Sequence, residues 1–169
     1  MITLDRNKTV AFTGHRPKDM PANYSTGTAE DQIRSDTAKQ ILNLYQQGYS
    51  TFLSGMAQGF DLLAAETVLS LRDQYPDIRL IPVIPFRGQH WRFDDNDSRR
   101  YADILAQTDR KIILSEYYFK DCFLSRNRYM LDHASQLIAY WTGKSYGGTY
   151  YTVREAWSRQ IPVHNICSL

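Results

Sequence analysis

The 169-residue sequence has few cysteines, little net charge and no long apolar run. Its two cysteines, Cys122 and Cys167, lie far apart and match neither a CxxC pair nor a zinc-site spacing, so we expect a reduced, cytoplasmic setting. The first ten residues hold no apolar signal-peptide core, and no apolar stretch is long enough to cross a bilayer. The histidines stand at no ligand spacing with carboxylates or cysteines, which predicts no metal site. We therefore expect neither a membrane nor a metal partner.

The overall composition narrows the class of protein further. A net charge of +2 is too small to indicate a nucleic-acid-binding surface, and the arginines between residues 87 and 100 are offset by neighbouring aspartates. Hydrophobic residues make up 43% of the chain and charged residues 22%, as in ordinary globular proteins. No repeat, low-complexity tract or linker divides the sequence, so we expect residues 1–169 to form a single domain. Apolar helix faces could support a homo-oligomer, but nothing in the sequence specifies one.

Strand-like and helix-like segments alternate along the whole chain. Strands are predicted over residues 8–13, 51–53, 79–84, 110–115, 135–141 and 161–166. Helices are predicted over residues 28–47, from 60 to about 75, up to about 107, and over 124–133 and 149–160. Such alternation predicts an α/β fold with a mostly parallel sheet of five to six strands and helices on both faces. A ligand of such a sheet binds beyond the carboxyl ends of the strands, near the point where the strand order reverses.

The most informative stretch is residues 51–66, TFLSGMAQGFDLLAAE, which reads as a strand, a glycine-containing turn and a helix start. Ser54 and Gly55 end the strand, and Gly59 allows the backbone to pass close to a neighbour or a ligand. A strand that enters a helix through such a turn directs free backbone N–H groups at an anion, most often phosphate. Asp61 is equally well explained as a ribose ligand or as a helix-start residue favoured by the helix dipole.

Further candidates follow other strands at the same edge of the sheet. His15 and Arg16 come directly after the first strand, which favours a phosphate or ribose role over a purely structural one. Gly147 and Gly148 lead into a helix, and with Thr149 they are either a phosphate cradle or a simple turn. Two loop aromatics, Phe86 and Trp91, suit stacking on a base and packing on their own domain equally well.

Four of these blocks, taken in order, resemble a known superfamily. They are Gly14-His15-Arg16, Ser54-Gly55-x-Ala57-x-Gly59-x-Asp61, Arg126-Asn127-Arg128 and Gly147-Gly148-Thr149. Together they resemble the SLOG superfamily, which unites the DNA-processing protein Smf/DprA with the lonely-guy phosphoribohydrolases. The chain is most similar to the small YspA/YpsA-like branch, which carries a GHR loop and a Pro-Phe…Gln…Trp segment, here Pro85-Phe86 with Gln89 and Trp91. The resemblance covers nearly the whole chain.

The resemblance implies a Rossmann-like fold with a pocket for a nucleotide or a nucleotide-derived molecule, such as a nucleoside monophosphate, ADP-ribose or an NAD-like dinucleotide. It also implies that Arg126 or Arg128 holds phosphate. In a phosphoribohydrolase, Arg128 and Glu155 would form the catalytic pair, with Glu155 in the final position of a GGxGTxxE motif. Here the segment 147–152 is one residue longer than that motif and lacks its third glycine. We therefore favour a binding or sensing protein over an N-glycosidase, and a DNA-processing accessory role ranks third.

Overall fold

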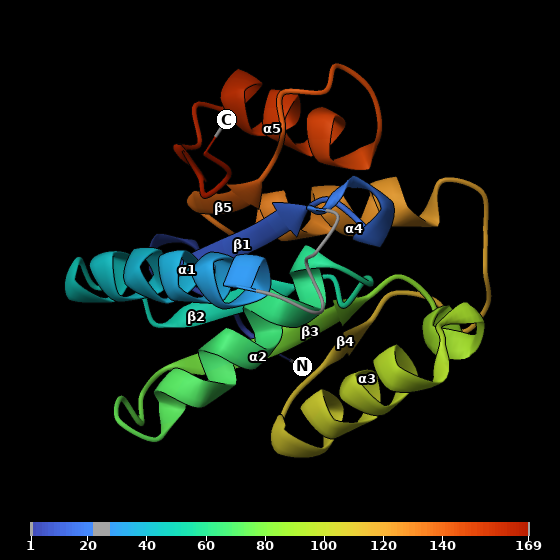
Figure 1. Ribbon diagram of the computed structural model, residues 1–169, viewed down its shortest axis with the longest axis horizontal. Coiled ribbons are helices and arrows are strands. Elements are labelled where there is room, and N and C mark those ends of the chain that lie inside the picture. Colours follow the sequence, from blue (N-terminus) through green and yellow to red (C-terminus); the bar gives the residue numbers. More distant parts are fainter. Residues whose placement is uncertain (1, 22–27, 169) are drawn as a thin grey trace.

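The computed structural model describes residues 2–21 and 28–168, which build one six-stranded sheet (Figure 1). The strand order is β4-β3-β2-β1-β5-β6, and every neighbouring pair is parallel. The strands are β1 (Thr9–Gly14), β2 (Thr51–Ser54), β3 (Arg79–Ile84), β4 (Ile112–Ile113), β5 (Gln136–Tyr140) and β6 (Val163–Asn165). This is the α/β, Rossmann-like fold predicted from the alternation and the resemblance.

Within the described residues, five α-helices cover the two faces of the sheet. They are α1 (Thr28–Gln46), α2 (Phe60–Arg72), α3 (Asp95–Gln107), α4 (Cys122–Asp132) and α5 (Gly148–Ser158). Short 3-10 helices η1 (Arg6–Lys8), η2 (Pro17–Asp19) and η3 (Gln89–Arg92) lie in the connections. Helices α1, α2 and α3 pack on one face, whereas α4 and α5 pack on the other (Figure 1). Each layer therefore buries its own hydrophobic core against the sheet.

Strand β1 lies between these two cores because its side chains alternate between the faces. Val10 and Phe12 belong to the core under α1–α3, and Ala11 belongs to the core under α4 and α5. The Phe12 ring contacts Phe52 and Phe60, with ring centroids 6.0 and 6.2 Å away. The chain extends the sheet on one side of β1 up to β4 and returns to add β5 and β6 on the other side. The strand order thus reverses between β1 and β5, which places a crevice at their carboxyl ends.

The edge strands are shorter than the sequence predicts. Residues 110–115 were expected to form a strand, but only Ile112 and Ile113 pair with β3, and among the described residues β4 has no second neighbour. The N–H of Leu114 still donates to the Ile84 carbonyl, so the chain stays beside β3 for one more residue. In the parts of the chain that the structure describes, no helix has both the length and the apolar character needed to cross a membrane.

Candidate functional site

A cavity of about 500 Å³ opens at the carboxyl ends of β1 and β5, where the strand order reverses. Its walls come from the loop after β1, the β2–α2 turn, the start of α4 and the loop that enters α5. The lining residues are Thr13, Gly14, His15, Arg16, Lys18, Asp19, Ala57, Asp61, Phe123, Leu124, Arg126, Asn127, Lys144, Tyr146, Gly147, Gly148, Thr149 and Tyr151. Of the predicted binding residues, Gly14, His15, Arg16, Asp61, Arg126, Gly147, Gly148 and Thr149 are brought together here.

Three predicted glycines serve close packing within the protein. A Cβ on Gly59 would lie 2.5 Å from the His15 carbonyl oxygen, and a Cβ on Gly14 would overlap the Phe60 side chain. Gly59 also has φ +91°, which side chains rarely adopt. These glycines let the loop after β1 and the start of α2 approach each other, and the Phe60 N–H donates to the His15 carbonyl at 3.1 Å. Gly55 is packed in the same way, because a Cβ there would meet the Arg126 guanidinium. Gly55 and Gly59 therefore shape the site from behind and do not line the cavity.

Asp61 is the second residue of α2 and has an unpaired oxygen at the cavity. Its side chain is 6% exposed, and Oδ2 accepts a hydrogen bond from the Ala57 N–H at 3.3 Å. Oδ1 is buried and has no hydrogen-bond partner among the described residues. Burial raises the pKa of Asp61, although Arg126 and the Ala57 N–H act in the opposite direction. A buried acceptor without a donor is costly, and such atoms in native proteins often mark a ligand-binding site.

Arg126 is the arginine of α4 that faces the site. It is 4% exposed, and its guanidinium donates from Nη1 to the Gly55 carbonyl and from Nε to Asn127 Oδ1 at 2.8 Å. A Cβ on Gly55 would lie 2.6 Å from this guanidinium, so the glycine makes room for it. Burial lowers the pKa of Arg126, and the Asp61 carboxylate raises it. Arg126 thus holds the turn after β2 and presents part of its side chain to the cavity.

His15 joins the loops that follow β1 and β5. Its ring is 4% exposed, and the Thr142 N–H donates to its Nε2 at 3.0 Å. This bond requires the neutral ring with the proton on Nδ1, because Nε2 must act as an acceptor. Burial lowers the pKa of His15, which favours the same neutral form. His15 therefore lines the cavity as a fixed structural tie between the two loops.

The amino end of α5 supplies backbone N–H groups at the cavity. Gly147 precedes the helix with φ +94°, and no described side chain caps this end. The Tyr151 N–H donates to the Gly147 carbonyl, so the N–H groups of Gly148, Thr149 and Tyr150 have no intrahelical acceptor. A Cβ on Gly147 or Gly148 would meet nothing within 4 Å, unlike one on the glycines behind the site. An uncapped helix start beside open space is a natural anion site.

Charged side chains surround this helix start. Lys144 Nζ lies 2.9 Å from Asp19 Oδ2 and 4.2 Å from the centre of the Tyr146 ring. The Lys144 hydrogen bond lowers the pKa of Asp19 and raises that of Lys144. The Arg16 guanidinium lies 4.9 Å from the centre of the Phe123 ring and has no ion pair with any described residue. The cavity thus places the Arg16 guanidinium, which has no ion pair among the described residues, in the same space as the free N–H groups at the start of α5.

A second hollow of about 790 Å³ adjoins the cavity and contains the two predicted aromatics. Phe86 and Trp91 both line it, and neither lines the main cavity. The two spaces share Arg16, Ala57 and Phe123 as a common wall. The Phe86 ring packs on Phe123 with 6.2 Å between centroids, so Phe86 also contributes to packing within the domain.

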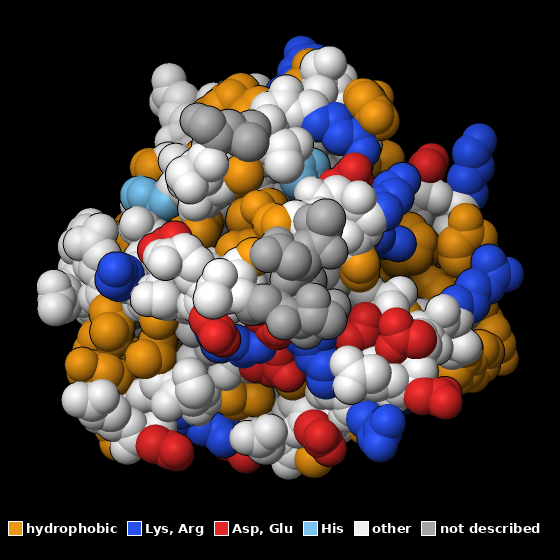
Figure 2. Space-filling model, in the orientation of Figure 1, with side chains coloured by type: hydrophobic (Ala, Val, Ile, Leu, Met, Phe, Trp, Pro, Cys, Tyr) orange, Lys and Arg blue, Asp and Glu red, His pale blue; other side chains and the backbone are white. Residues whose placement is uncertain are grey.

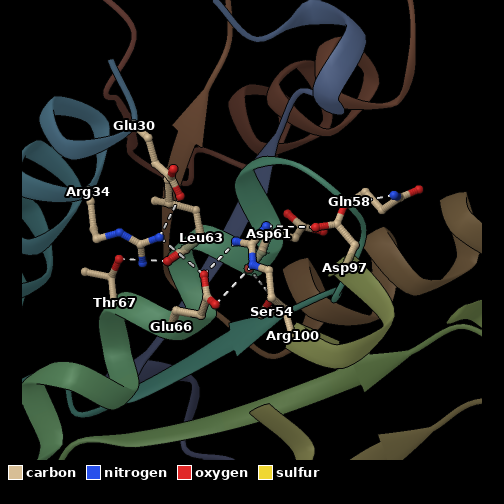
Figure 3. A network of polar contacts seen from close by, with 10 residues as sticks. All are labelled: Glu30, Arg34, Ser54, Gln58, Asp61, Leu63, Glu66, Thr67, Asp97 and Arg100. Carbon is tan, nitrogen blue, oxygen red and sulfur yellow. Dashed lines mark hydrogen bonds and ion pairs between the residues drawn. The ribbon is translucent and has the colours of Figure 1, made fainter. Parts of the chain in front are cut away.

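A network of ion pairs supports the β2–α2 turn from outside (Figure 3). Arg100 on α3 donates to both carboxylate oxygens of Glu66 on α2, at 2.6 and 3.1 Å, and to Asp97 at 2.9 Å. Asp97 also accepts from the Gln58 side-chain amide at 2.9 Å. Within the turn, the Ser54 hydroxyl donates to the Asp61 carbonyl, so Ser54 shapes the turn and does not line the cavity. Helix α3 is therefore linked both to α2, which carries Asp61, and to the turn before it through Gln58.

The predicted catalytic pair lies outside the cavity. Glu155 is beyond the first turn of α5, and its Oε1 accepts hydrogen bonds from Arg159 at 3.1 and 3.2 Å. Arg128 is exposed on α4, because residues two apart on a helix face different directions and Arg126 takes the inward position. Neither Glu155 nor Arg128 lines the cavity.

Several lining residues were not singled out from the sequence. Lys144 and Tyr146 lie within the three residues before Gly147, and Lys18 and Asp19 lie just after the GHR loop. Their nearness to these motifs could have marked them as candidate lining residues. The approach of Phe123 to Arg16 had no such signal, since it depends on how α4 packs. Among the described residues, no group of three His, Cys, Asp or Glu side chains could hold a metal ion.

Comparison with known proteins agrees with the resemblance noted in the sequence. A UPF0398 protein of Bacillus pumilus is 26% identical over 151 residues, which cover 88% of this chain and 81% of that protein. The UPF0398 protein YpsA of Bacillus subtilis is 23% identical over 155 residues, covering 90% and 86%. A UPF0398 protein of Staphylococcus epidermidis is 28% identical over 133 residues, covering 78% and 71%.

The fold also has a solved counterpart. The X-ray structure of TM1055, a target of the Northeast Structural Genomics Consortium, is similar with a TM-score of 0.54 and 16% identity over 92% of this chain and 72% of that one. This likeness concerns the fold alone. The model of the YspA SLOG family matches residues 10–165, nearly the full length of the chain. The predicted superfamily and branch are confirmed, and the chain belongs to the YspA SLOG family.

Proposed function

We propose that the protein binds a nucleotide or a nucleotide derivative in the main cavity. One observation carries the proposal: an uncapped helix start and a buried, unpaired carboxylate oxygen line the same space. The N–H groups at the start of α5 suit a phosphate, and Asp61 Oδ1 suits a hydroxyl donor such as those of ribose. A nucleotide carries both groups in one molecule. The cavity volume of about 500 Å³ falls within the usual range for small-molecule sites.

Binding is favoured over N-glycosidic cleavage and over DNA binding. The carboxylate that the resemblance implies for cleavage of the glycosidic bond is Glu155, and it pairs with Arg159 and does not line the cavity. Basic and acidic side chains are interspersed among the described residues on the face drawn in Figure 2, which does not suit a polyanion.

The first experiment is to incubate the purified protein with a mixed panel of nucleotides and nucleosides and to analyse bound and free fractions by mass spectrometry. We expect an intact nucleotide to be retained and its nucleoside to be lost, because the nucleoside has no phosphate for the start of α5. Release of free base and ribose 5-phosphate would show an enzyme. Retention of no nucleotide at all would overturn the proposal.

A matched pair of variants tests the phosphate position. Gly148→Asp and Gly148→Asn add side chains of the same size, and a Cβ at this position meets nothing within 4 Å. Only aspartate adds a negative charge at the helix start, where it would repel phosphate. We expect Gly148→Asp to weaken nucleotide binding by at least about tenfold relative to Gly148→Asn. Equal binding by the two variants would place the phosphate elsewhere.

A further inference from the structure

We propose that the second hollow binds a second aromatic base, so that the full ligand is a pyrophosphate-bridged dinucleotide. This inference rests on the proposed function of the main cavity and extends it to a substrate class. The hollow measures about 790 Å³ and shares Arg16, Ala57 and Phe123 with the main cavity. One ligand can therefore reach both spaces across this wall.

The shared wall presents a cation where the bridging phosphates would lie. Arg16 is exposed, and its guanidinium is placed over the Phe123 ring at 4.9 Å from the centroid. Among the described residues it has no acidic partner within ion-pair distance. A guanidinium can contact two phosphate oxygens at once, which matches a pyrophosphate passing between the two spaces.

Trp91 gives the second hollow a flat, accessible aromatic surface. Its side chain is 79% exposed, although tryptophan is usually well buried. A Cβ on Gly88 would lie 2.7 Å from the Trp91 ring, so one face of the indole rests against the Gly88 backbone. The same short helix is anchored by His90, which stacks on Tyr101 with 4.8 Å between centroids. A ring that is fixed on one side and open on the other suits stacking with a base.

Gln89 adds a polar group that lacks a partner. It is 6% exposed, lines the hollow and donates from Nε2 to the Gly55 carbonyl at 3.1 Å. This bond fixes the amide so that Oε1 is the free acceptor, and Oε1 is buried without a partner among the described residues. An exocyclic amino group, such as that of adenine, would satisfy it. The hollow therefore repeats the pattern of the main cavity, with an unpaired buried acceptor beside a surface that fits part of a nucleotide.

The test compares three ligands by isothermal titration calorimetry on the full chain. The probes are adenosine monophosphate, ADP-ribose and diadenosine diphosphate, which add first a second phosphate together with a ribose and then a second base. We expect diadenosine diphosphate to bind at least about tenfold more tightly than ADP-ribose, because stacking on an aromatic side chain is worth this much for one base. Trp91→Ala should remove that advantage and leave the affinity for adenosine monophosphate unchanged.

Two further variants sharpen the assignment. Gln89→Leu removes the Oε1 acceptor and also the Nε2 hydrogen bond to the Gly55 carbonyl, and it should weaken diadenosine diphosphate by about tenfold more than it weakens adenosine monophosphate. Trp157→Ala is the matched control, since Trp157 is 54% exposed on α5 and lines neither space. It should leave all three affinities unchanged.

Other results would overturn the inference in distinguishable ways. Equal affinities for ADP-ribose and diadenosine diphosphate would show that the hollow takes no second base while the main cavity still binds a nucleotide. A Trp91→Ala variant that changes the oligomeric state in light scattering and keeps the affinity for diadenosine diphosphate would make the hollow a protein interface. Absence of binding by all three probes would remove the proposed function together with this extension.

Discussion

Replacement of Asp61 by asparagine should stabilise the ligand-free protein and lower its affinity for the proposed ligand. The Asp61 side chain is 6% exposed, and its Oδ1 has no hydrogen-bond partner among the described residues. The pKa of Asp61 is raised in the folded state, mainly by burial, so the fold favours the neutral carboxyl even though Arg126 attracts the charged form. Asparagine keeps an oxygen for the Ala57 N–H and removes the buried charge. A charge that is costly in the free protein is expected where a ligand supplies the missing partner.

The size of the effect follows from the unpaired oxygen. Leaving a buried polar group unsatisfied costs about 1–3 kcal/mol, and since the asparagine amide is itself only partly satisfied, we expect a gain of about 1–2 kcal/mol in the free energy of unfolding at about pH 7. This corresponds to a rise of roughly 2–8 °C in Tm for a domain of this size.

The sign of the pH dependence is fixed by the raised pKa. Ionised Asp61 destabilises the fold fully above its folded pKa, and the penalty fades as the pH falls through that pKa and is gone below the ordinary value of 3.8, where the carboxyl is protonated in both states. The advantage of Asp61→Asn should therefore shrink as the pH is lowered from about 7 to about 4. Urea unfolding of the ligand-free wild type and of Asp61→Asn at several pH values measures this change in relative stability.

Asp103→Asn is the control. Asp103 is exposed on α3, and its replacement by asparagine changes the net charge by the same amount as Asp61→Asn. It should change stability by no more than about 0.5 kcal/mol. An Asp61→Asn variant less stable than wild type at about pH 7 would refute the reasoning, because it would mean that attraction to Arg126 outweighs the cost of burial.

Three further changes test the framework of the site. Gly59→Ala should lower the free energy of unfolding by about 3 kcal/mol, because it combines an unfavourable φ of +91° with a clash against the His15 carbonyl. Arg100→Ala should cost about 1–3 kcal/mol through the lost two-oxygen contact with Glu66, as measured by urea unfolding. Because burial lowers the pKa of His15, wild-type stability should fall as the pH drops below the ordinary value of 6.5, and His15→Gln should reduce that slope.

Each of these has an internal comparison. Gly48→Ala has the same backbone problem at φ +101° but nothing within 4 Å, so it should cost less than Gly59→Ala, and equal costs would deny the importance of the close approach. Arg87→Ala removes a similar contact with Glu116 at the surface and should have little effect; a loss as large as that of Arg100→Ala would contradict the network argument. His164 has a pKa lowered by burial as well, so a slope abolished by His164→Gln alone would remove the assignment to His15.

The sequence was sufficient for the fold because its periodicity is local. Each predicted strand and helix has a counterpart, and the turn at Gly59 begins a helix as its neighbours indicated. Edge strands were overestimated, because the apolar run at residues 110–115 does not reveal that β4 has one neighbour. The sequence left the role of Gly59 open between a close approach to a neighbour and one to a ligand. The structure shows the neighbour, because a Cβ on Gly59 would meet the His15 carbonyl, whereas one on Gly148 would face open space.

Position along a helix explains why the catalytic prediction did not lead to the cavity. A motif match assigns Glu155 by its distance from the glycines, but one extra residue rotates a helical position by about 100°. The Glu155 carboxylate then accepts hydrogen bonds from Arg159, which lies one helical turn further along the chain, and this pair lies outside the cavity lining. Two residues that face the cavity, Asp61 and Arg126, could not have been ranked from spacing. Asp61 is recognised by a buried oxygen without a partner, and Arg126 is recognised by its burial.

The unpaired atoms give the most direct link from this structure to a ligand. Asp61 Oδ1 and Gln89 Oε1 lie on either side of the shared wall, one lining each space, and each is an acceptor that is buried without a donor. Arg16, between the two spaces, is a cation without an ion pair among the described residues. A folded protein retains such groups at a cost in stability, and the proposed dinucleotide would offset that cost by supplying a sugar hydroxyl, a pyrophosphate and an amino-bearing base in that order.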